Sequence, residues 1–116
     1  VVTASTDSID FLKPIKVDSE VYLESFVTWT KNTSMEVFVK IIAEDLYTGE
    51  QLLCATSFLT FVAIGDDGKP TTVPKVIPET DLEIFLFEQA PFRAENRKRR
   101  RKESYNLITK IKENYN

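Results

Sequence analysis

The side chains of this 116-residue sequence that could do acid–base chemistry are carboxylates, because the sequence contains no histidine. Without imidazole, these residues cannot form a Ser/His or Cys/His dyad or a histidine-based metal site. Glu36, Glu44 and Asp45 could act together as a paired acid and base. Their spacing along an alternating strand pattern instead favours a solvated face, so we expect no catalytic pair there.

Two other chemistry-bearing motifs favour structural roles. Cys54 is the single cysteine, which excludes an internal disulfide, and we expect it to be a small buried apolar residue. A lone cysteine also favours a reducing compartment, so we predict a cytoplasmic protein. Asp66-Asp67-Gly68 resembles the start of a calcium-binding loop, but the downstream ligands are absent. This segment is therefore predicted to be a turn, and we predict no metal site.

Charge is unevenly distributed along the chain. Residues 1–92 carry six basic and 15 acidic side chains, a net charge of −9, whereas residues 93–116 carry nine basic and three acidic ones, a net charge of +6. The basic run at 97–102 could contact nucleic acid. It lacks interleaved aromatic residues that would stack on bases, so we favour a solvent-facing stretch of a terminal helix and expect no nucleic-acid partner.

Alternating apolar and polar residues predict long strands that position these groups. The pattern and its turn residues predict an antiparallel meander at about 1–11, 20–31, 34–47 and 51–64. Large apolar residues lie on both faces of these strands, which predicts that both faces are covered. The longest mostly apolar run, residues 52–64, is shorter than the ~18 residues of a membrane span, so no membrane association is predicted.

The second half of the chain has the pattern of a helix. Thr80 and Glu83 form a predicted capping box that begins a helix at about residue 80, and Pro91 is expected to interrupt it. We predict a strand domain at residues 1–78 and a basic helical tail at 79–116. Phe11 is expected to lie in the core, just before Lys13 and Pro14.

Three stretches taken together resemble the hotdog-fold acyl-CoA thioesterases, in the acyl-CoA hydrolase branch. They read VVTAS...DSIDFLKPIKV, VTWTKNTSMEVFVKIIAEDLYTGE and FLTFVAIGDDGKP followed by IPET, and they cover roughly residues 1–82. The resemblance implies an α+β fold in which an antiparallel sheet wraps a long central helix. The family's N-terminal strand and central helix have no counterpart in these 116 residues and are expected upstream of Val1.

The resemblance also implies a function. The expected activity is hydrolysis of fatty acyl-CoA to free acid and coenzyme A, and the alternative is a non-catalytic acyl-CoA-binding or sensing module. The catalytic carboxylate is expected on the central helix upstream of Val1, so no residue of this chain is predicted to be the base. Water activated by a carboxylate suffices for a thioester, so no cofactor is implied. The expected assembly is a homo-oligomer built from dimers, a hexamer arranged as a trimer of dimers.

Coenzyme A carries several phosphate charges, and an acidic chain must concentrate cations to bind them. The expected contacts are Lys31, Thr33 and Ser34, with Lys13 as a weaker candidate. The family usually has Gly followed by Arg before this hairpin, whereas this sequence has Lys31-Asn32, which moves the positive charge by one position. It also usually has Gly-Asp after the Lys-Val pair, where this sequence has Asp18-Ser19.

Overall fold

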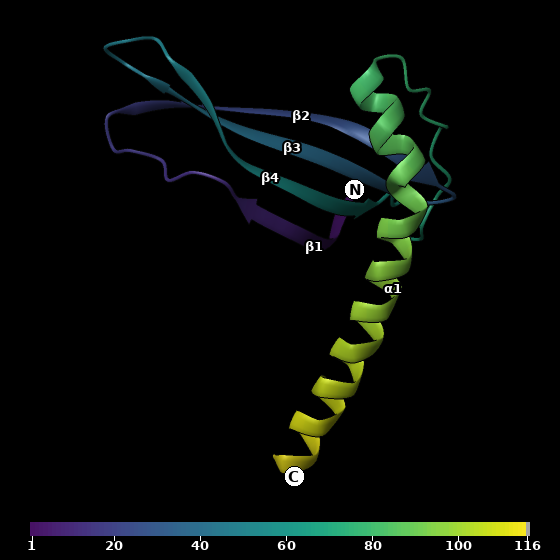
Figure 1. Ribbon diagram of the computed structural model, residues 1–116. Coiled ribbons are helices and arrows are strands. Elements are labelled where there is room, and N and C mark those ends of the chain that lie inside the picture. Colours follow the sequence, from purple (N-terminus) through teal and green to yellow (C-terminus); the bar gives the residue numbers. More distant parts are fainter. Residues whose placement is uncertain (116) are drawn as a thin grey trace. The chain divides into compact units, whose positions relative to one another are not determined.

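The computed structural model describes residues 1–115, which form four antiparallel strands and one long helix (Figure 1). The strands are β1 (Val2–Phe11), β2 (Ser19–Lys31), β3 (Ser34–Asp45) and β4 (Gln51–Val62), and the helix is α1 (Asp81–Asn114). The α+β class and the positions of all five elements are confirmed, with differences of at most two residues at the strand ends. Within residues 1–115, no helix is long and apolar enough to cross a membrane.

The sheet has the order β1-β4-β3-β2, so β1 and β2 are its edges. The predicted meander holds for β2, β3 and β4, which follow one another through short turns. It is wrong for β1, which pairs with β4 and not with β2. The connection after β1 contains Pro14 and is too long for a tight hairpin, so β1 is free to pair at the far edge.

Three phenylalanines from neighbouring strands form the packed centre of one sheet face. Phe26, Phe38 and Phe58 lie in one row of the register, with ring centroids 5.6 and 5.1 Å apart for the two neighbouring pairs. Phe38, the middle ring, is buried. Such tilted and edge-on aromatic pairs stabilise a sheet beyond the area that they bury. Cys54 is also fully buried, as its residue type predicted.

The segment between β4 and α1 begins with the predicted turn. The Asp67 side chain accepts a hydrogen bond from the Lys69 backbone N–H at 3.0 Å, and Gly68 has a φ of 77° that favours glycine. The chain then returns along the sheet end that carries the β2–β3 hairpin. There the backbone N–H of Val73 donates to Asn32 O at 2.9 Å, and that of Val76 donates to the Thr30 hydroxyl at 3.1 Å.

Helix α1 begins as predicted and then continues through Pro91. The Thr80 hydroxyl caps its first turn by accepting a hydrogen bond from the Glu83 backbone N–H at 3.1 Å. The prediction that Pro91 interrupts the helix is wrong, because one helix spans residues 81–114. In the turns around the proline, the Arg93 guanidinium donates to the Leu86 carbonyl, a contact that supports the backbone there.

The basic run is mostly exposed on this helix, as predicted, with one exception. Residues 98–102 are exposed, whereas Arg97 is only 9% exposed, so the prediction of a solvent-facing run is wrong for that residue. A helix repeats every 3.6 residues, so one side chain in such a run necessarily falls on the same face as Leu86 and Ala90, both of which are buried. The chain divides into two compact units, Val1–Glu79 and Thr80–Asn116.

Candidate functional site

The β2–β3 hairpin carries three of the four predicted coenzyme A contacts. Lys31 pairs with Ser34 across a two-residue loop, and Asn32 takes the left-handed conformation, with a φ of 53°, that such a tight loop requires. The Thr33 carbonyl accepts a hydrogen bond from the Ala63 N–H at 2.9 Å. Together with the Asn32 carbonyl, it ties the loop to the segment after β4. Both loop residues of the hairpin are therefore held by backbone hydrogen bonds from that segment.

The hairpin side chains differ in what they can offer a phosphate. Lys31 is exposed, so its ammonium can approach a phosphate, and Thr33 is half-buried beside it. Ser34 already donates its hydroxyl proton to the Lys31 carbonyl at 3.1 Å. A serine hydroxyl has one proton, so Ser34 can donate to a ligand only by breaking that local bond. Lys31 and Thr33 are consequently the better-placed candidates.

Lys13 lies in a different place, in the extended segment after β1. Its backbone N–H and that of Leu12 both donate to the Cys54 carbonyl, at 3.2 and 2.8 Å. The segment lines a mostly apolar hollow of about 530 Å³, formed by Phe11, Leu12, Lys13, Pro14 and Ile15. Phe11 is 75% exposed, so the prediction that it lies in the core is wrong. Its strand is a sheet edge and ends at Phe11, so its side chain opens onto the hollow.

Lys13 and Lys31 are at opposite ends of the sheet. Phe11, two residues before Lys13, pairs with Ala55, whereas Ser34, the partner of Lys31, pairs with Val62. These positions on β4 are seven residues apart, or roughly 23 Å at ~3.3 Å per residue. One phosphate cannot contact both lysines of a single copy.

Two strand carboxylates are buried, and one of them, Glu36, was predicted to face solvent. Glu36 is 1% exposed and accepts a hydrogen bond from the Thr28 hydroxyl at 2.7 Å. Asp7 is 9% exposed and accepts hydrogen bonds from the hydroxyls of Thr60, at 2.8 Å, and Ser5. The prediction of a solvated carboxylate is therefore wrong for Glu36, whereas Glu44 and Asp45 are half-exposed near a turn.

The register explains why the alternation pattern missed this arrangement. Thr60 pairs with Glu36 on one side and with Ser5 on the other, so the buried polar residues form a row across all four strands. Irregularities in β1 around Asp7 and in β2 around Thr28 bring these two side chains into the row. The one sign of this burial in the sequence was the presence of threonines, Thr28 and Thr60, on the neighbouring strands, whose hydroxyls can donate to a buried carboxylate.

These buried carboxylates lead to a prediction about catalysis. Asp7→Asn and Glu36→Gln remove the negative charge that a general base needs but keep the shape and one acceptor oxygen of each side chain. At Asp7, which accepts from two hydroxyls, one of the two must turn to accept a hydrogen bond from the new amide group. If the full-length protein has the thioesterase activity that the resemblance implies, we expect its turnover in these variants to stay within about tenfold of the wild type, equivalent to roughly 1.4 kcal/mol. The same limit is expected for Asp10→Asn, Glu44→Gln and Asp45→Asn. A thousandfold loss in any correctly folded variant, measured in a thioester hydrolysis assay, would place the general base in this chain.

Tyr22 lies among carboxylates at the end of the sheet away from the hairpin. Its hydroxyl donates to Glu44 Oε2 at 3.2 Å, and Glu20 pairs directly with Glu44. Hydrogen bonding to Glu20, partial loss of hydration and the contact with Glu44 raise the pKa of Tyr22 from 10.0 to about 12. Since the neutral phenol is favoured in the folded state, its contribution to stability is present below pH 10 and is lost as the pH rises from 10 to 12.

This shift can be measured directly. We expect the phenolate absorbance of the wild type minus that of Tyr22→Phe to titrate with a midpoint near pH 12. In Glu20→Gln the midpoint should move down toward the ordinary value, because the negative charge is removed. A midpoint near 10 in the wild type would contradict the arrangement of Tyr22 and its carboxylates.

The comparisons with known proteins agree with this geometry. Residues 1–50, which contain all four candidate contacts, match the thioesterase superfamily. An acyl-CoA hydrolase from Staphylococcus aureus, solved with butyryl coenzyme A and coenzyme A, superposes with a TM-score of 0.87. The two are 47% identical over 95% of this chain and 67% of that one. This chain belongs to the hotdog-fold thioesterase superfamily.

Other members of the superfamily are also similar. The uncharacterized acyl-CoA thioester hydrolase YkhA of Bacillus subtilis is 58% identical over 95% of this chain. An apo-hexameric acyl-CoA thioesterase is 52% identical, with a TM-score of 0.81 over 85% of this chain and 64% of that one. The chain spans 64% of the length of YkhA, less than two thirds of that curated relative.

Proposed function

We propose that this superfamily member is part of an acyl-CoA thioesterase that hydrolyses fatty acyl-CoA to a free acid and coenzyme A. The observation that carries the proposal is the superposition on the S. aureus acyl-CoA hydrolase, which was solved with butyryl coenzyme A and coenzyme A. That similarity extends over 95% of the chain, and the family match over residues 1–50 includes both Lys31 and Lys13. In this proposal, residues 1–78 are the strand part of the hotdog domain and residues 79–116 are a helical tail.

The reaction needs one general base and one activated water. A carboxylate outside these residues takes a proton from the water, whose oxygen attacks the thioester carbonyl carbon. The carbon–sulfur bond then breaks, and coenzyme A leaves as a thiolate that takes up a proton. This chain contributes the binding of the nucleotide end. Lys31 supplies a positive charge, and the Thr33 and Ser34 hydroxyls supply neutral hydrogen-bonding groups. Lys13, at the apolar hollow, is the weaker candidate for the same role.

The proposed partner, besides acyl-CoA, is a second copy of the chain. Both edges of the sheet are free of strand partners among residues 1–115, and exposed edges are commonly paired in assemblies. The hexameric thioesterase described above supports a homo-oligomer, for which we propose a trimer of dimers. It follows from the positions of the two lysines that any phosphate contacted by both Lys13 and Lys31 would lie between two copies. A cytoplasmic location is proposed from the free, buried thiol of Cys54.

The direct test is a hydrolysis assay with the full-length protein. Release of coenzyme A from fatty acyl-CoA, followed with a thiol reagent, is the expected result. The matched measurement is binding of the product coenzyme A by calorimetry. Binding without turnover would instead favour the non-catalytic acyl-CoA-binding module. Absence of both binding and turnover, in correctly folded protein, would contradict the proposed function.

A further inference from the structure

The distal part of α1 together with its C-cap residue Tyr115, residues 98–115, carries an exposed apolar stripe that the proposed reaction does not use. We call these residues the distal helix. Ile108, Ile111 and Tyr115 follow one another at spacings of three and four residues, so they lie on one face of the helix. They are 47, 45 and 85% exposed, and Leu107 beside them is 60% exposed. Continued toward the N-terminus at the same spacing, this face contains Ala90 and Arg97, which are buried. Along this one face, the helix thus has buried residues in its first half and exposed apolar residues in its second.

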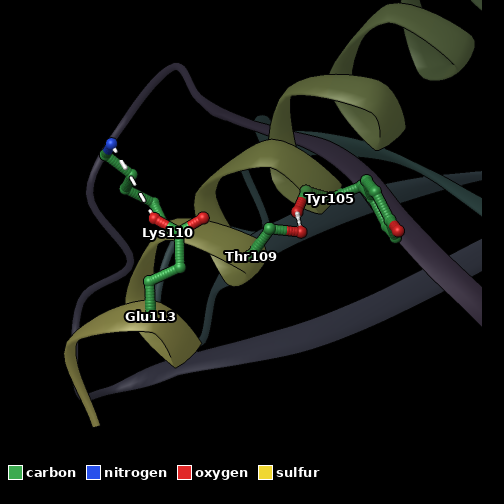
Figure 2. A network of polar contacts seen from close by, with 4 residues as sticks. All are labelled: Tyr105, Thr109, Lys110 and Glu113. Carbon is green, nitrogen blue, oxygen red and sulfur yellow. Dashed lines mark hydrogen bonds and ion pairs between the residues drawn. The ribbon is translucent and has the colours of Figure 1, made fainter. Parts of the chain in front are cut away.

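The opposite face of the distal helix is polar and makes contacts within the helix. Figure 2 shows the ion pair between Lys110 and Glu113, at 3.9 Å, and the Thr109 hydroxyl donating to the Tyr105 carbonyl at 2.9 Å. Contacts of this kind between neighbouring turns support an exposed helix. The distal helix therefore has a polar side suited to water and an apolar side suited to a partner.

Charge selects among the possible partners. Residues 98–115 carry seven basic and two acidic side chains, whereas residues 1–79 carry six basic and 12 acidic ones. Two distal helices would therefore repel one another, and the distal helix and a sheet unit would attract. We propose that the apolar stripe of the distal helix is a docking surface for the sheet unit of a second copy. This inference rests on the proposed homo-oligomer and adds a contact to it.

The sheet unit has a surface of matching chemistry at the turn between β3 and β4. Leu46 and Tyr47 are 61 and 85% exposed there, between the carboxylates of Asp45 and Glu50. Lys16 is the nearby cation and only partly offsets them. The raised pKa of Tyr22 reports the same negative field a few residues along β2. Exposed apolar side chains within a negative field suit a helix that is apolar on one side and basic overall.

The first test is the oligomeric state of the full-length protein, measured by sedimentation velocity across a dilution series. We expect Ile108→Glu combined with Ile111→Glu to raise the concentration at which the oligomer dissociates at least tenfold. The matched control, Asn106→Glu combined with Thr109→Glu, adds the same charges to the polar face and should leave the oligomer intact. A monomeric wild type would refute the oligomer itself, whereas an oligomer that survives the stripe variant would refute only this docking surface.

The second test identifies what contacts the stripe. Protein with Ile108→Cys is mixed with protein with Tyr47→Cys and oxidised mildly, the buried Cys54 being left in place. We expect a disulfide between the two different proteins as the main product. Ile108→Cys protein crosslinked mainly to itself would show helix-to-helix pairing and overturn the proposal. Binding to anionic phospholipid vesicles that Ile108→Glu abolishes, with the assembly unchanged, would assign the stripe to a membrane surface and overturn it as well.

Discussion

With the proposed thioesterase activity, replacing Lys31 with glutamate should raise the KM of the full-length protein for fatty acyl-CoA by roughly ten- to a hundredfold. A charge-assisted hydrogen bond to a phosphate contributes on the order of 1.5–3 kcal/mol, and reversing the charge removes it. The exposed position of Lys31, on a hairpin tied to the segment after β4, leaves the fold unaffected by the change. KM and kcat are measured with acyl-CoA and with the corresponding acyl-pantetheine, which lacks the nucleotide.

The two substrates separate binding of the nucleotide from every other effect. With acyl-pantetheine, the KM of Lys31→Glu should equal that of the wild type. Lys102→Glu makes the same charge change on an exposed position of α1 and should leave both KM values unchanged. Lys13→Glu, made at the other end of the sheet, should have a smaller effect on the KM for acyl-CoA. Equal increases with both substrates in Lys31→Glu would contradict the assignment of this residue to coenzyme A.

Replacing Phe38 with alanine should lower the free energy of unfolding by about 3–5 kcal/mol. Phe38 is 7% exposed and contacts Phe26 and Phe58 from the neighbouring strands, so its removal leaves a cavity in the centre of the sheet face. A loss of this size is a large part of the total stability of an ordinary domain. Urea denaturation of the full-length protein, at one fixed protein concentration, measures it.

Two further variants make this prediction specific to packing. Phe38→Leu fills much of the space and should cost less than about 1.5 kcal/mol. Phe11→Ala removes the same ring from a side chain that is 75% exposed and should change stability by no more than about 0.5 kcal/mol. If Phe11→Ala and Phe38→Ala were equally destabilising, the aromatic row would not be the centre of the core.

Several features followed from the sequence because they depend on neighbouring residues. Alternation over β2, β3 and β4 reports which side chains share a face, and short polar turns report where a strand ends. The capping hydroxyl of Thr80 acts on a backbone group three residues away, so its position alone marked the start of α1. The order and spacing of these segments, taken with the residues of the β2–β3 hairpin, also sufficed to indicate the thioesterase superfamily.

Burial of individual polar side chains was decided only in three dimensions. Glu36 and Asp7 look like solvated strand residues, yet each lies in a row whose members come from different strands and are brought together by register irregularities. The same holds for Phe11, an apolar residue that is exposed because its strand is a sheet edge.

The relation between the two candidate lysines was decided in the same way. Lys13 and Lys31 look alike in the sequence, since each lies at the end of a predicted strand or just after it. They lie at opposite ends of the sheet because β1 and β2 run antiparallel to one another, and they lie at opposite edges because β1 pairs with β4 and not with β2. Local sequence determines the conformation of a strand, whereas its place in the sheet depends on pairing with distant residues. For this chain, the sequence alone therefore specified the elements and the superfamily, and strand pairing decided which candidate residues meet.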